Sequence, residues 1–344
     1  MAVDPQVALA ERQGRQLRYE GAVGGAMPIV RALGDGMAGD HVLSIDAILN
    51  GTSNYILTEV EKSGAAFNDV LAEAQRLGYA EADPTADVDG FDARSKLAIL
   101  SALAFGQKIQ ANDIFTQGIR RITPIDFQYA HTLKHTIRLV CAARQTAEGL
   151  ILSVRPALIP QSTILAGVQG AYNAIWVRGK YGQDTFYYGR GAGPEPTGVA
   201  VVSDLMRVAR EIRSGSPERV SPFAHEQLAA FRPVSVLVQK RAYYLRFRVH
   251  DRPGIIAALA IGCGPQTQGV ETKMTTSTPA PVAQVAVSRL VADGATRLMA
   301  RDNTFSDNGW AVRLMASTQD AVFAGNSFVG NTFDVATNSR QSSA

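Results

Sequence analysis

The chain has 344 residues, of which 46% are hydrophobic and 19% charged, and it carries a net charge of +3. This length accommodates two or three domains, while the small net charge and the lack of Lys/Arg clusters argue against binding to nucleic acid. Two cysteines are too few for a disulfide framework, the first residues lack the apolar stretch of a signal peptide, and no apolar run reaches the ~20 residues of a membrane span. We therefore expect a cytoplasmic protein with neither a membrane nor a nucleic-acid partner.

The N-terminal part of the chain alternates between candidate strands and candidate helices. Pro28 suits the first turn of a helix, and Gly78 suits a helix end because glycine readily adopts the left-handed conformation. The predicted elements are a short helix at Val7–Gln13, a strand at Leu17–Glu20, a helix from Pro28 to Leu33, an apolar strand at His41–Asn50, a helix beginning at Gly51-Thr52-Ser53 and an amphipathic helix at Phe67–Leu77.

Residues 81–92 hold five carboxylates and no basic side chain. Pro84 and Gly90 argue against a continuous helix in this segment. The apolar run Leu97–Phe105 predicts a buried helix that begins near Asp92. The carboxylates then occupy a loop and the N-terminus of a helix, where free backbone N–H groups favour negative charge.

Two interpretations of this acidic loop compete. In the first, the carboxylates cap a helix and are otherwise solvated. In the second, they form a site for a substrate ammonium group, and Lys96, one helical turn after Asp92, handles a proton. A pair with this spacing holds the lysine ammonium in place and favours its charged form. The spacing alone leaves both interpretations open.

The middle of the chain adds strands and one long helix. A glycine-rich loop, GRGAGPEPTG, precedes the helix, which we expect to begin at about Thr197. Alternation of strands and helices, with several strands adjacent in sequence, predicts an α+β fold with α/β-type layers of sheet and helix. The predicted strands are Thr136–Ala142, Leu150–Pro156, Ala174–Arg178 and Phe186–Tyr188.

Neither glycine-rich loop has the spacing of a dinucleotide-binding fingerprint. GAVGGAM differs from G-x-G-x-x-G, and GRGAGP has Pro194 where the third glycine belongs. We interpret both as tight turns that allow close backbone approach. His131 and His135 have helical spacing but no evident third ligand, so we interpret them as structural rather than zinc-binding.

The composition changes after residue 240. Tyr243–His250 alternates like a strand and leads through a turn into the apolar run Ile255–Ile261. Residues 262–284 are polar and rich in Pro and Thr, as in a linker. Beyond them, DNTFSDN recurs as GNSFVGN 23 residues later, from Asn303 to Asn326, a period that suits rungs of a parallel β-helix.

Several of these segments together resemble homoserine dehydrogenase. The segments YEGAVGGAMPIVRAL, ILNGTSNYIL and GRGAGPEPTGVAVVSDL are similar to that family in the expected order, and the resemblance spans roughly residues 5–262. It favours the substrate-site interpretation of the acidic loop. The family's active-site pattern is matched by Ala74, Gly78, Tyr79, Ala80, Asp83-Pro84, Asp87, Gly90, Asp92 and Lys96.

The resemblance implies a role for each matching residue. Lys96, held by Asp92, would exchange a proton with the substrate oxygen while hydride moves between the substrate carbon and the nicotinamide of NAD(P). The other implied residues are Glu81 and Asp87 for the ammonium and hydroxyl end of homoserine; Gly51, Thr52 and Tyr79 for the pocket lining; Gly191, Gly193 and Glu195, within residues 189–197, for the cofactor; and Glu20 with the carbonyls of Val23, Gly25 and Met27 for a monovalent cation, Na⁺ or K⁺.

The resemblance also predicts a domain organisation and a function. We expect interconversion of L-homoserine and L-aspartate 4-semialdehyde, in threonine and methionine biosynthesis, by a homodimer. The predicted segments are a remnant of the nucleotide-binding half at 1–16, a catalytic and dimerisation domain at 17–235, a truncated ACT-like βα segment at 236–261, the linker at 262–284 and a β-helix-like tail at 285–344.

Two features differ from the family pattern. The nucleotide-binding half expected before YEGAVGG is missing from the chain, so activity would be impaired, and the alternative is a non-catalytic dimerisation or substrate-binding module. The tail resembles the parallel β-helix proteins that assist copper delivery to nitrous-oxide reductase. We expect no partner strands for Tyr243–His250, no amino-acid feedback site, and a tail after residue 262 that is loosely docked or disordered.

Overall fold

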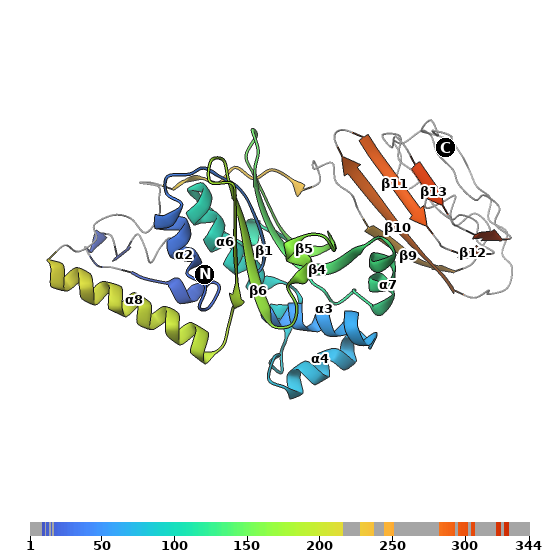
Figure 1. Cartoon of the computed structure of the whole chain (residues 1–344), viewed down its shortest axis with the longest axis horizontal. Coiled ribbons are helices and arrows are strands. Elements are labelled where there is room, and N and C mark those ends of the chain that lie inside the picture. The colour runs from blue at the N-terminus through green and yellow to red at the C-terminus, as the bar shows by residue number, and fades with distance from the viewer. Residues whose placement is uncertain are drawn as a thin grey trace. The chain divides into compact units, whose positions relative to one another are not determined.

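The computed structural model describes residues 17–215 without interruption, together with 9–10, 12–13, 15, 228–236, 244–250, 282–292, 295–301, 304–306, 321–324 and 327–329. The chain divides into two units, Met1–Val238 and Gln239–Ala344. Figure 1 shows the strands of the first unit in green beside helices in blue and teal. The candidate site residues all belong to this first unit.

The helices of the first unit begin and end where local sequence signals place them. Asn50 caps α3 by accepting a hydrogen bond from Ser53 N, and Gly64 ends it in the left-handed conformation. Thr123 and Asp126 form a capping box at the start of α7, with Pro124 in its first turn. The described helices are α2 (Ile29–Arg31), α3 (Gly51–Ser63), α4 (Phe67–Arg76), α5 (Thr85–Val88), α6 (Phe91–Phe105), α7 (Pro124–Thr132) and α8 (Pro194–Ser214).

A six-stranded sheet forms the centre of the first unit, in the order β3-β5-β4-β1-β6-β7. Its pairs are antiparallel except for β3 with β5. The long β4–β5 ladder runs from His135 opposite Pro160 to Gln145 opposite Leu150. The strands are β1 (Val42–Ile48), β3 (Phe115–Thr116), β4 (His135–Gln145), β5 (Leu150–Pro160), β6 (Tyr172–Gly179) and β7 (Asp184–Arg190), with the short pair β2 (Gln107–Lys108) and β8 (Ala229–Ala230) outside the sheet.

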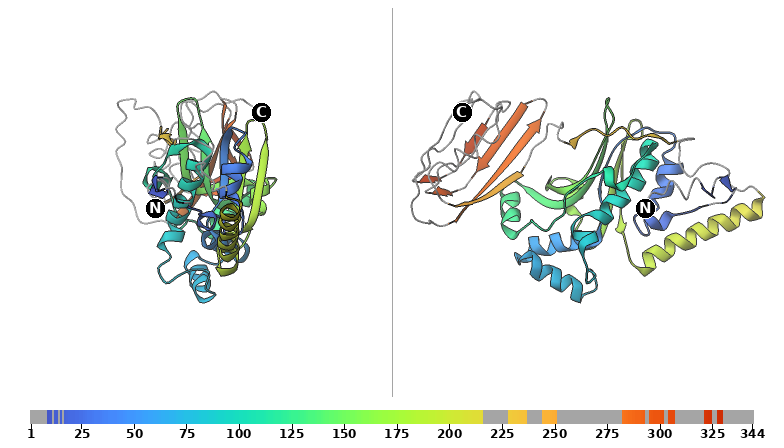
Figure 2. Two further views of the ribbon diagram at one scale, coloured as in Figure 1. Left: turned by 90° about the vertical axis from the view of Figure 1, so that its left-hand side faces the viewer. Right: turned by 180° about the vertical axis from the view of Figure 1, so that it is seen from behind.

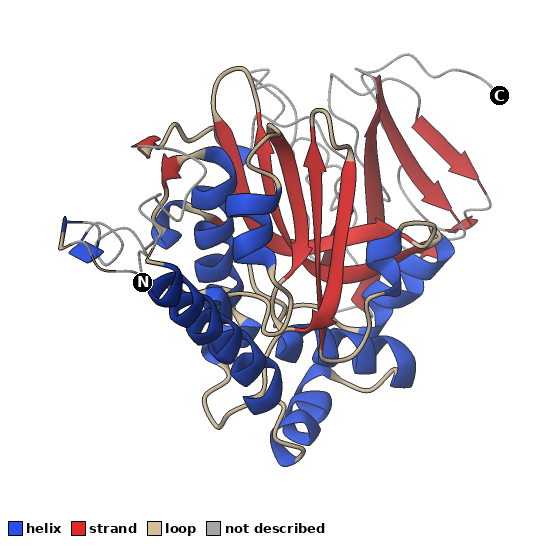
Figure 3. Ribbon diagram, turned by 60° about the vertical axis from the view of Figure 1, so that its left-hand side comes forward, coloured by secondary structure: helices blue, strands red, loops and turns tan. Residues whose placement is uncertain are grey.

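The main core lies between this sheet and the helices on one of its faces. Alternate residues of β1, such as Ile45 and Ala47, join Ile56 and Leu57 of α3 and Leu97 of α6 in one buried cluster. The left-hand view of Figure 2 shows teal α6 to one side of the green strands, and Figure 3 distinguishes the helices from the strands by colour. The helices therefore hold one face of the sheet and place the N-terminus of α3 at the end of β1.

The opposite face of the sheet has a smaller apolar cluster. It includes Val140 and Ala142 of β4, Ile48 of β1 and Ala174 of β6, together with residues of the turn Ile164–Gly167. Trp176 and Phe186 pack against them while half-buried. Among the described residues, this second cluster receives no side chain from an α-helix.

Most predicted elements are present, with three differences. The strand expected at Leu17–Glu20 is wrong, because residues 17–19 are irregular and Glu20 begins the 3₁₀ turn η1 (Glu20–Ala22). The long helix begins at Pro194 rather than about Thr197. Four residues of the acidic segment form the short helix α5. The predicted helix at Val7–Gln13 lies partly outside the described residues.

The second unit contains a four-stranded sheet in the order β13-β11-β10-β9. The expectation that the strand ending at His250 has no partner is wrong, because β9 pairs antiparallel with β10. β10 also begins inside the predicted linker. The strands are β9 (Tyr244–His250), β10 (Val282–Ala292), β11 (Ala295–Arg301), β12 (Thr304–Ser306), β13 (Ala321–Ala324) and β14 (Ser327–Val329).

Two pairs of strands in the second unit are parallel. Leu298 of β11 lies opposite Ala321 of β13, and Thr304 of β12 lies opposite Ser327 of β14. Both pairs join residues 23 positions apart, the spacing of the sequence repeat. The ACT-like and copper-accessory resemblances are not tested by this pairing and stay predictions. Residues Ile255–Ile261 lie outside the described part of the chain.

Candidate active site

Asn50 lies between the end of β1 and the start of α3, and its side chain forms hydrogen bonds with two carboxylates of the acidic segment. Its Oδ1 atom accepts from Ser53 N at 2.8 Å, which caps α3. Its Nδ2 atom donates to Asp87 Oδ1 at 2.6 Å and to Asp92 Oδ2 at 2.9 Å. Ser53 Oγ adds a bond to the carbonyl of Asp87 at 2.7 Å. The start of α3 therefore gathers two of the predicted carboxylates.

Lys96 joins the same group of side chains from the next turn of α6. Its Nζ donates to Asp92 Oδ2 at 2.6 Å and to the carbonyl of Leu49 at 3.2 Å. The Lys96 side chain is 17% exposed and that of Asp92 is 32% exposed. The ammonium is therefore fixed by an anion and a carbonyl while solvent or a small ligand can still reach it. We call Asn50, Asp87, Asp92 and Lys96 the acidic cluster.

Asn50 was not among the site residues predicted from the sequence. A local signal for its capping role was present, because Asn directly before the first residue of a helix is a favoured N-cap. What no local signal could reveal is the second half of its role, because Asp87 and Asp92 lie about forty positions further along the chain.

Thr52, two residues after Asn50, and Tyr79 are the predicted pocket-lining side chains, and they are in contact with each other. Thr52 Oγ1 donates to the carbonyl of Tyr79 at 2.7 Å. The Tyr79 ring stacks on Tyr55 of α3 with centroids 4.4 Å apart. Glu81 is exposed, and its segment is held by Gln75, whose Nε2 donates to the carbonyl of Glu81 at 3.0 Å. Thr52 and Tyr79 thus make direct contact, whereas the Glu81 side chain is exposed to solvent.

The predicted cofactor loop approaches the acidic cluster through buried Asn173 of β6. A Cβ atom at Gly191 would overlap the Asn173 side-chain amide, and one at Gly51 would lie 3.6 Å from Asn173 Oδ1. Gly193 has a φ of +116°, which favours glycine, and it precedes the first turn of α8, where Glu195 is exposed. Asn173 therefore separates the loop around Gly191 from the start of α3.

Glu20, the predicted cation ligand, is buried and serves a nearby helix. Its carboxylate accepts from Val30 N at 2.8 Å and from Arg31 N at 3.1 Å, and it lies 3.7 Å from the Arg31 guanidinium. Burial raises the pKa of this carboxyl, although the two backbone N–H groups and the Arg31 charge act in the opposite direction. Its own N–H donates to Asp204 of α8 at 2.9 Å.

The oxygens predicted to hold a cation are partly engaged within the protein. Glu20 caps α2 as described, and the carbonyl of Met27 accepts from Ile29 N at 2.8 Å. Val23 and Gly25 are buried in the same loop, and a Cβ atom at Gly25 would lie 2.6 Å from the carbonyl oxygen of Arg190. Two of the four predicted ligands, the Glu20 carboxylate and the Met27 carbonyl, therefore already accept hydrogen bonds within the protein. Among the described residues, no three His, Cys, Asp or Glu side chains group as a metal site.

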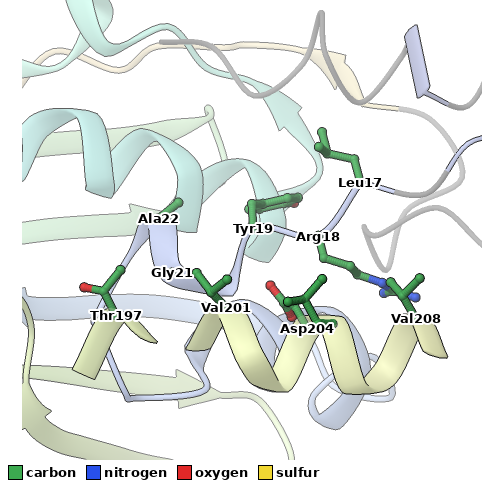
Figure 4. A pocket seen from close by; sticks show the side chains of 10 residues that line it. Leu17, Arg18, Tyr19, Gly21, Ala22, Thr197, Val201, Asp204 and Val208 are labelled. Atoms are coloured by element: carbon green, nitrogen blue, oxygen red, sulfur yellow. The ribbon is translucent and has the colours of Figure 1, made fainter. Parts of the chain in front are cut away.

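A cavity of about 520 Å³ lies elsewhere, between residues 17–22 and α8. Figure 4 shows Arg18 and Tyr19 on one wall and Thr197, Asp204 and Val208 of α8 on the other. None of the acidic-cluster residues lines it. The cavity is therefore separate from the candidate active site.

No helix in the described ranges is long and apolar enough to cross a membrane.

Comparison with known proteins gives one family. The homoserine dehydrogenase family profile matches residues 28–206. A homoserine dehydrogenase of Neisseria gonorrhoeae is 42% identical over 260 residues, covering 73% of this chain and 58% of its own length. The crystal structure of a homoserine dehydrogenase from Thiobacillus denitrificans has 45% identity and a TM-score of 0.68, with 73% of this chain and 59% of that protein covered.

A hyperthermophilic archaeal homoserine dehydrogenase in complex with NADPH is a more distant structural relative. It has 26% identity and a TM-score of 0.53, with 61% of this chain and 60% of that protein covered. The chain thus spans a little under two thirds of the length of the relatives it matches. The matched region includes the acidic cluster and the loops that surround it.

Proposed function

The chain belongs to the homoserine dehydrogenase family, and from this premise we propose that the acidic cluster binds L-homoserine and L-aspartate 4-semialdehyde for their NAD(P)-dependent interconversion. The observation that carries the proposal is the junction of Asn50, Asp87, Asp92 and Lys96 within hydrogen-bonding distance. The cluster brings two carboxylates, which suit the binding of an ammonium group, next to Lys96, a proton donor held in place by Asp92. Such an enzyme serves threonine and methionine biosynthesis.

The cluster assigns a charge role to each side chain. Asp87 and exposed Glu81 attract the α-ammonium of the substrate. The Lys96 ammonium, held in place by Asp92, donates its proton to the aldehyde oxygen as the C–H bond forms, and in the reverse direction the neutral amine accepts the hydroxyl proton. Thr52 and Tyr79, joined by a hydrogen bond, line the pocket.

The family resemblance assigns Gly191, Gly193 and Glu195 to the nicotinamide cofactor. The Gly191 loop packs against Asn173, whose Oδ1 would lie 3.6 Å from a Cβ atom at Gly51 in the first turn of α3. NAD(P)H, when bound, supplies the hydride. A monovalent cation at the Glu20 loop stays a prediction from the resemblance, and we route no proton step through it.

Calorimetric titration of L-homoserine into the full chain tests the proposal. We expect saturable binding that weakens roughly tenfold or more in Asp87→Asn, because a hydrogen bond to a charged partner is lost. Asp69→Asn, which changes an exposed carboxylate in the first turn of α4, should bind homoserine like the unsubstituted chain. Equal affinity in both variants, or no binding by the chain, would contradict the proposal.

The alternative is a non-catalytic substrate-binding or dimerisation module. It is motivated by the share of the relatives that the chain spans, 58% for the Neisseria protein. Spectrophotometric turnover separates the two. Oxidation of NADPH with L-aspartate 4-semialdehyde by the full chain supports the enzyme, whereas homoserine binding without turnover supports the module.

We also propose a homodimer that covers the second face of the sheet. That face carries Trp176, Phe186 and Tyr188, and Tyr188 is 51% exposed. An exposed apolar patch of this kind is typical of an interface. Light scattering should give the mass of two chains for the unsubstituted protein and of one chain for Trp176→Lys. A monomeric unsubstituted protein would contradict this part of the proposal.

A further inference from the structure

One side-chain amide connects the two carboxylates of the acidic cluster. Asn50 Nδ2 carries two hydrogens, and it has one acceptor at 2.6 Å, Asp87 Oδ1, and one at 2.9 Å, Asp92 Oδ2. The two acceptors come from different elements, α5 and the first turn of α6. The amide is therefore the shared partner of two side chains that like charge would drive apart.

The orientation of this amide is fixed by its other end. Oδ1 of Asn50 accepts from Ser53 N, so an exchanged amide would point NH₂ at another donor and a carbonyl at two carboxylates. Asn50 is only 5% exposed, which strengthens each of these hydrogen bonds relative to water. The N-cap of α3 therefore uses Oδ1 of Asn50, and the bridge between the two carboxylates uses Nδ2 of the same side chain.

The charges that face the amide explain what the bridge does. Lys96 neutralises Asp92 directly, with its Nζ at 2.6 Å from the same oxygen that Asn50 contacts. The thiol of Cys141 also lies within range of the Asp92 and Lys96 charges, and burial raises its pKa to about 12, so it stays neutral. Asn50 thus supplies a hydrogen-bond donor to both carboxylates, while Lys96 supplies the positive charge that pairs with Asp92.

We propose that Asn50 is a positioning residue, whose single amide holds Asp87 for the substrate ammonium and Asp92 for Lys96 in one fixed arrangement. The role of homoserine as the ligand rests on the function proposed above. The bridge itself is a property of the ligand-free protein and can be tested without homoserine. It acts through the two carboxylates and does not require Asn50 to touch the substrate.

Two substitutions separate the bridge from the cap. Asn50→Asp keeps an acceptor for Ser53 N but replaces the donor with a third carboxylate. Asn50→Ser keeps a good N-cap but is too short to bridge both acceptors. The bridge predicts that the stability lost in Asn50→Ser depends on its acceptors and shrinks once Asp87→Ala has removed one of them. A lost cap, in contrast, costs the same with or without the Asp87 carboxylate.

The experiment measures urea unfolding at neutral pH for the full chain, Asn50→Asp, Asn50→Ser, Asp87→Ala and the double variant Asn50→Ser/Asp87→Ala, together with homoserine titration of the full chain and the two Asn50 variants. We expect both Asn50 variants to be less stable than the unsubstituted chain, Asn50→Asp most of all, and the loss caused by Asn50→Ser to be smaller when Asp87→Ala is already present. Homoserine affinity should fall roughly tenfold in each Asn50 variant.

A stability loss in Asn50→Ser that is the same with and without the Asp87 carboxylate, or no stability loss in Asn50→Asp, would overturn the bridge whatever homoserine does. Homoserine affinity retained in Asn50→Asp would overturn its link to the substrate site. If the unsubstituted chain does not bind homoserine but the stability loss in Asn50→Ser depends on Asp87, the proposed function fails while the bridging role of Asn50 stands.

Discussion

The acidic segment 81–92 and the glycine-rich segment 20–31 both place carboxylates beside the start of a helix, but the carboxylates bind different partners. Asp87 and Asp92 accept from the side chain of Asn50, and Asp92 also from Lys96. Glu20 instead accepts from the backbone N–H groups of α2. The first arrangement is open to solvent on one side, whereas Glu20 is 4% exposed.

This difference teaches how to separate a binding carboxylate from a structural one. Glu20 satisfies helix donors that would otherwise be buried without partners, so its loss should be measured in stability. The acidic cluster is held by side chains that a ligand can rearrange, so its loss should be measured in binding and turnover. Four substitutions probe this contrast, and the largest effect is expected on catalysis.

Lys96→Ala should abolish most turnover and leave the fold nearly unchanged. Removal of a positioned general acid costs about 10² to 10⁴ in rate. The Lys96–Asp92 pair is partly exposed, so unfolding should change by no more than about 1 kcal/mol. Lys62→Ala, at an exposed lysine of α3, is the matched control. Near-normal turnover of homoserine by Lys96→Ala would refute the assigned role.

Glu20→Ala should have the opposite signature. It leaves two backbone N–H groups near the start of α2 without their acceptor, which costs about 3 kcal/mol. Urea unfolding should show this loss, while homoserine affinity of the folded fraction stays close to that of the unsubstituted chain. Unchanged stability together with lost homoserine affinity would indicate that Glu20 acts in the site instead.

Gly191→Ala probes the contact between the Gly191 loop and Asn173 of β6. The new methyl group would overlap the Asn173 amide, and overpacking of this kind costs about 1–3 kcal/mol. Asn173→Ala removes the overlapping atoms, so the double variant should be more stable than the sum of the two single changes predicts. Additive losses in a double-mutant cycle would show that the loop relaxes without meeting Asn173.

Glu20→Gln provides the smallest effect and a pH test. Burial, only partly offset by the two backbone N–H groups, raises the pKa of Glu20 in the folded chain. A raised pKa means that the folded state binds a proton more readily than the unfolded state, so stability from this group is lost as pH rises through the folded pKa. Glutamine does not titrate. The stability of Glu20→Gln relative to the unsubstituted chain should therefore improve as pH rises above the usual glutamate range.

Urea unfolding of both proteins over a pH series measures this trend. A difference that is constant with pH, or that favours glutamate increasingly at high pH, would contradict the raised pKa.

Local pattern predicted much of the fold because most elements depend on nearby residues. The apolar run after Asp92 became α6, and the apolar stretch before Asn50 became β1. The strand expected at Leu17–Glu20 failed because the fold turns Glu20 toward helix donors ten positions later. Helix α7 was not predicted, although Thr123 and Asp126 form the capping box that marks its start.

The candidate site was only partly predictable for the same reason. The spacing of Asp92 and Lys96 on one helix is local and leads directly to their ion pair. The amide of Asn50 and the overlap between Asn173 and Gly191 depend on how β1, β6 and the loops meet in space. The family resemblance supplied the roles of the residues, and the geometry supplied the partners that hold them.

The most direct test of this contrast is ¹³C-carboxyl NMR of the full chain during titration with L-homoserine. Assigned resonances of Asp87, Asp92 and Glu20 report each carboxylate separately. We expect the Asp87 and Asp92 signals to shift in a saturable manner with a common affinity while the Glu20 signal stays in place. A saturable shift of Glu20 with no change at Asp87 and Asp92 would contradict the assignment of the acidic cluster as the substrate site.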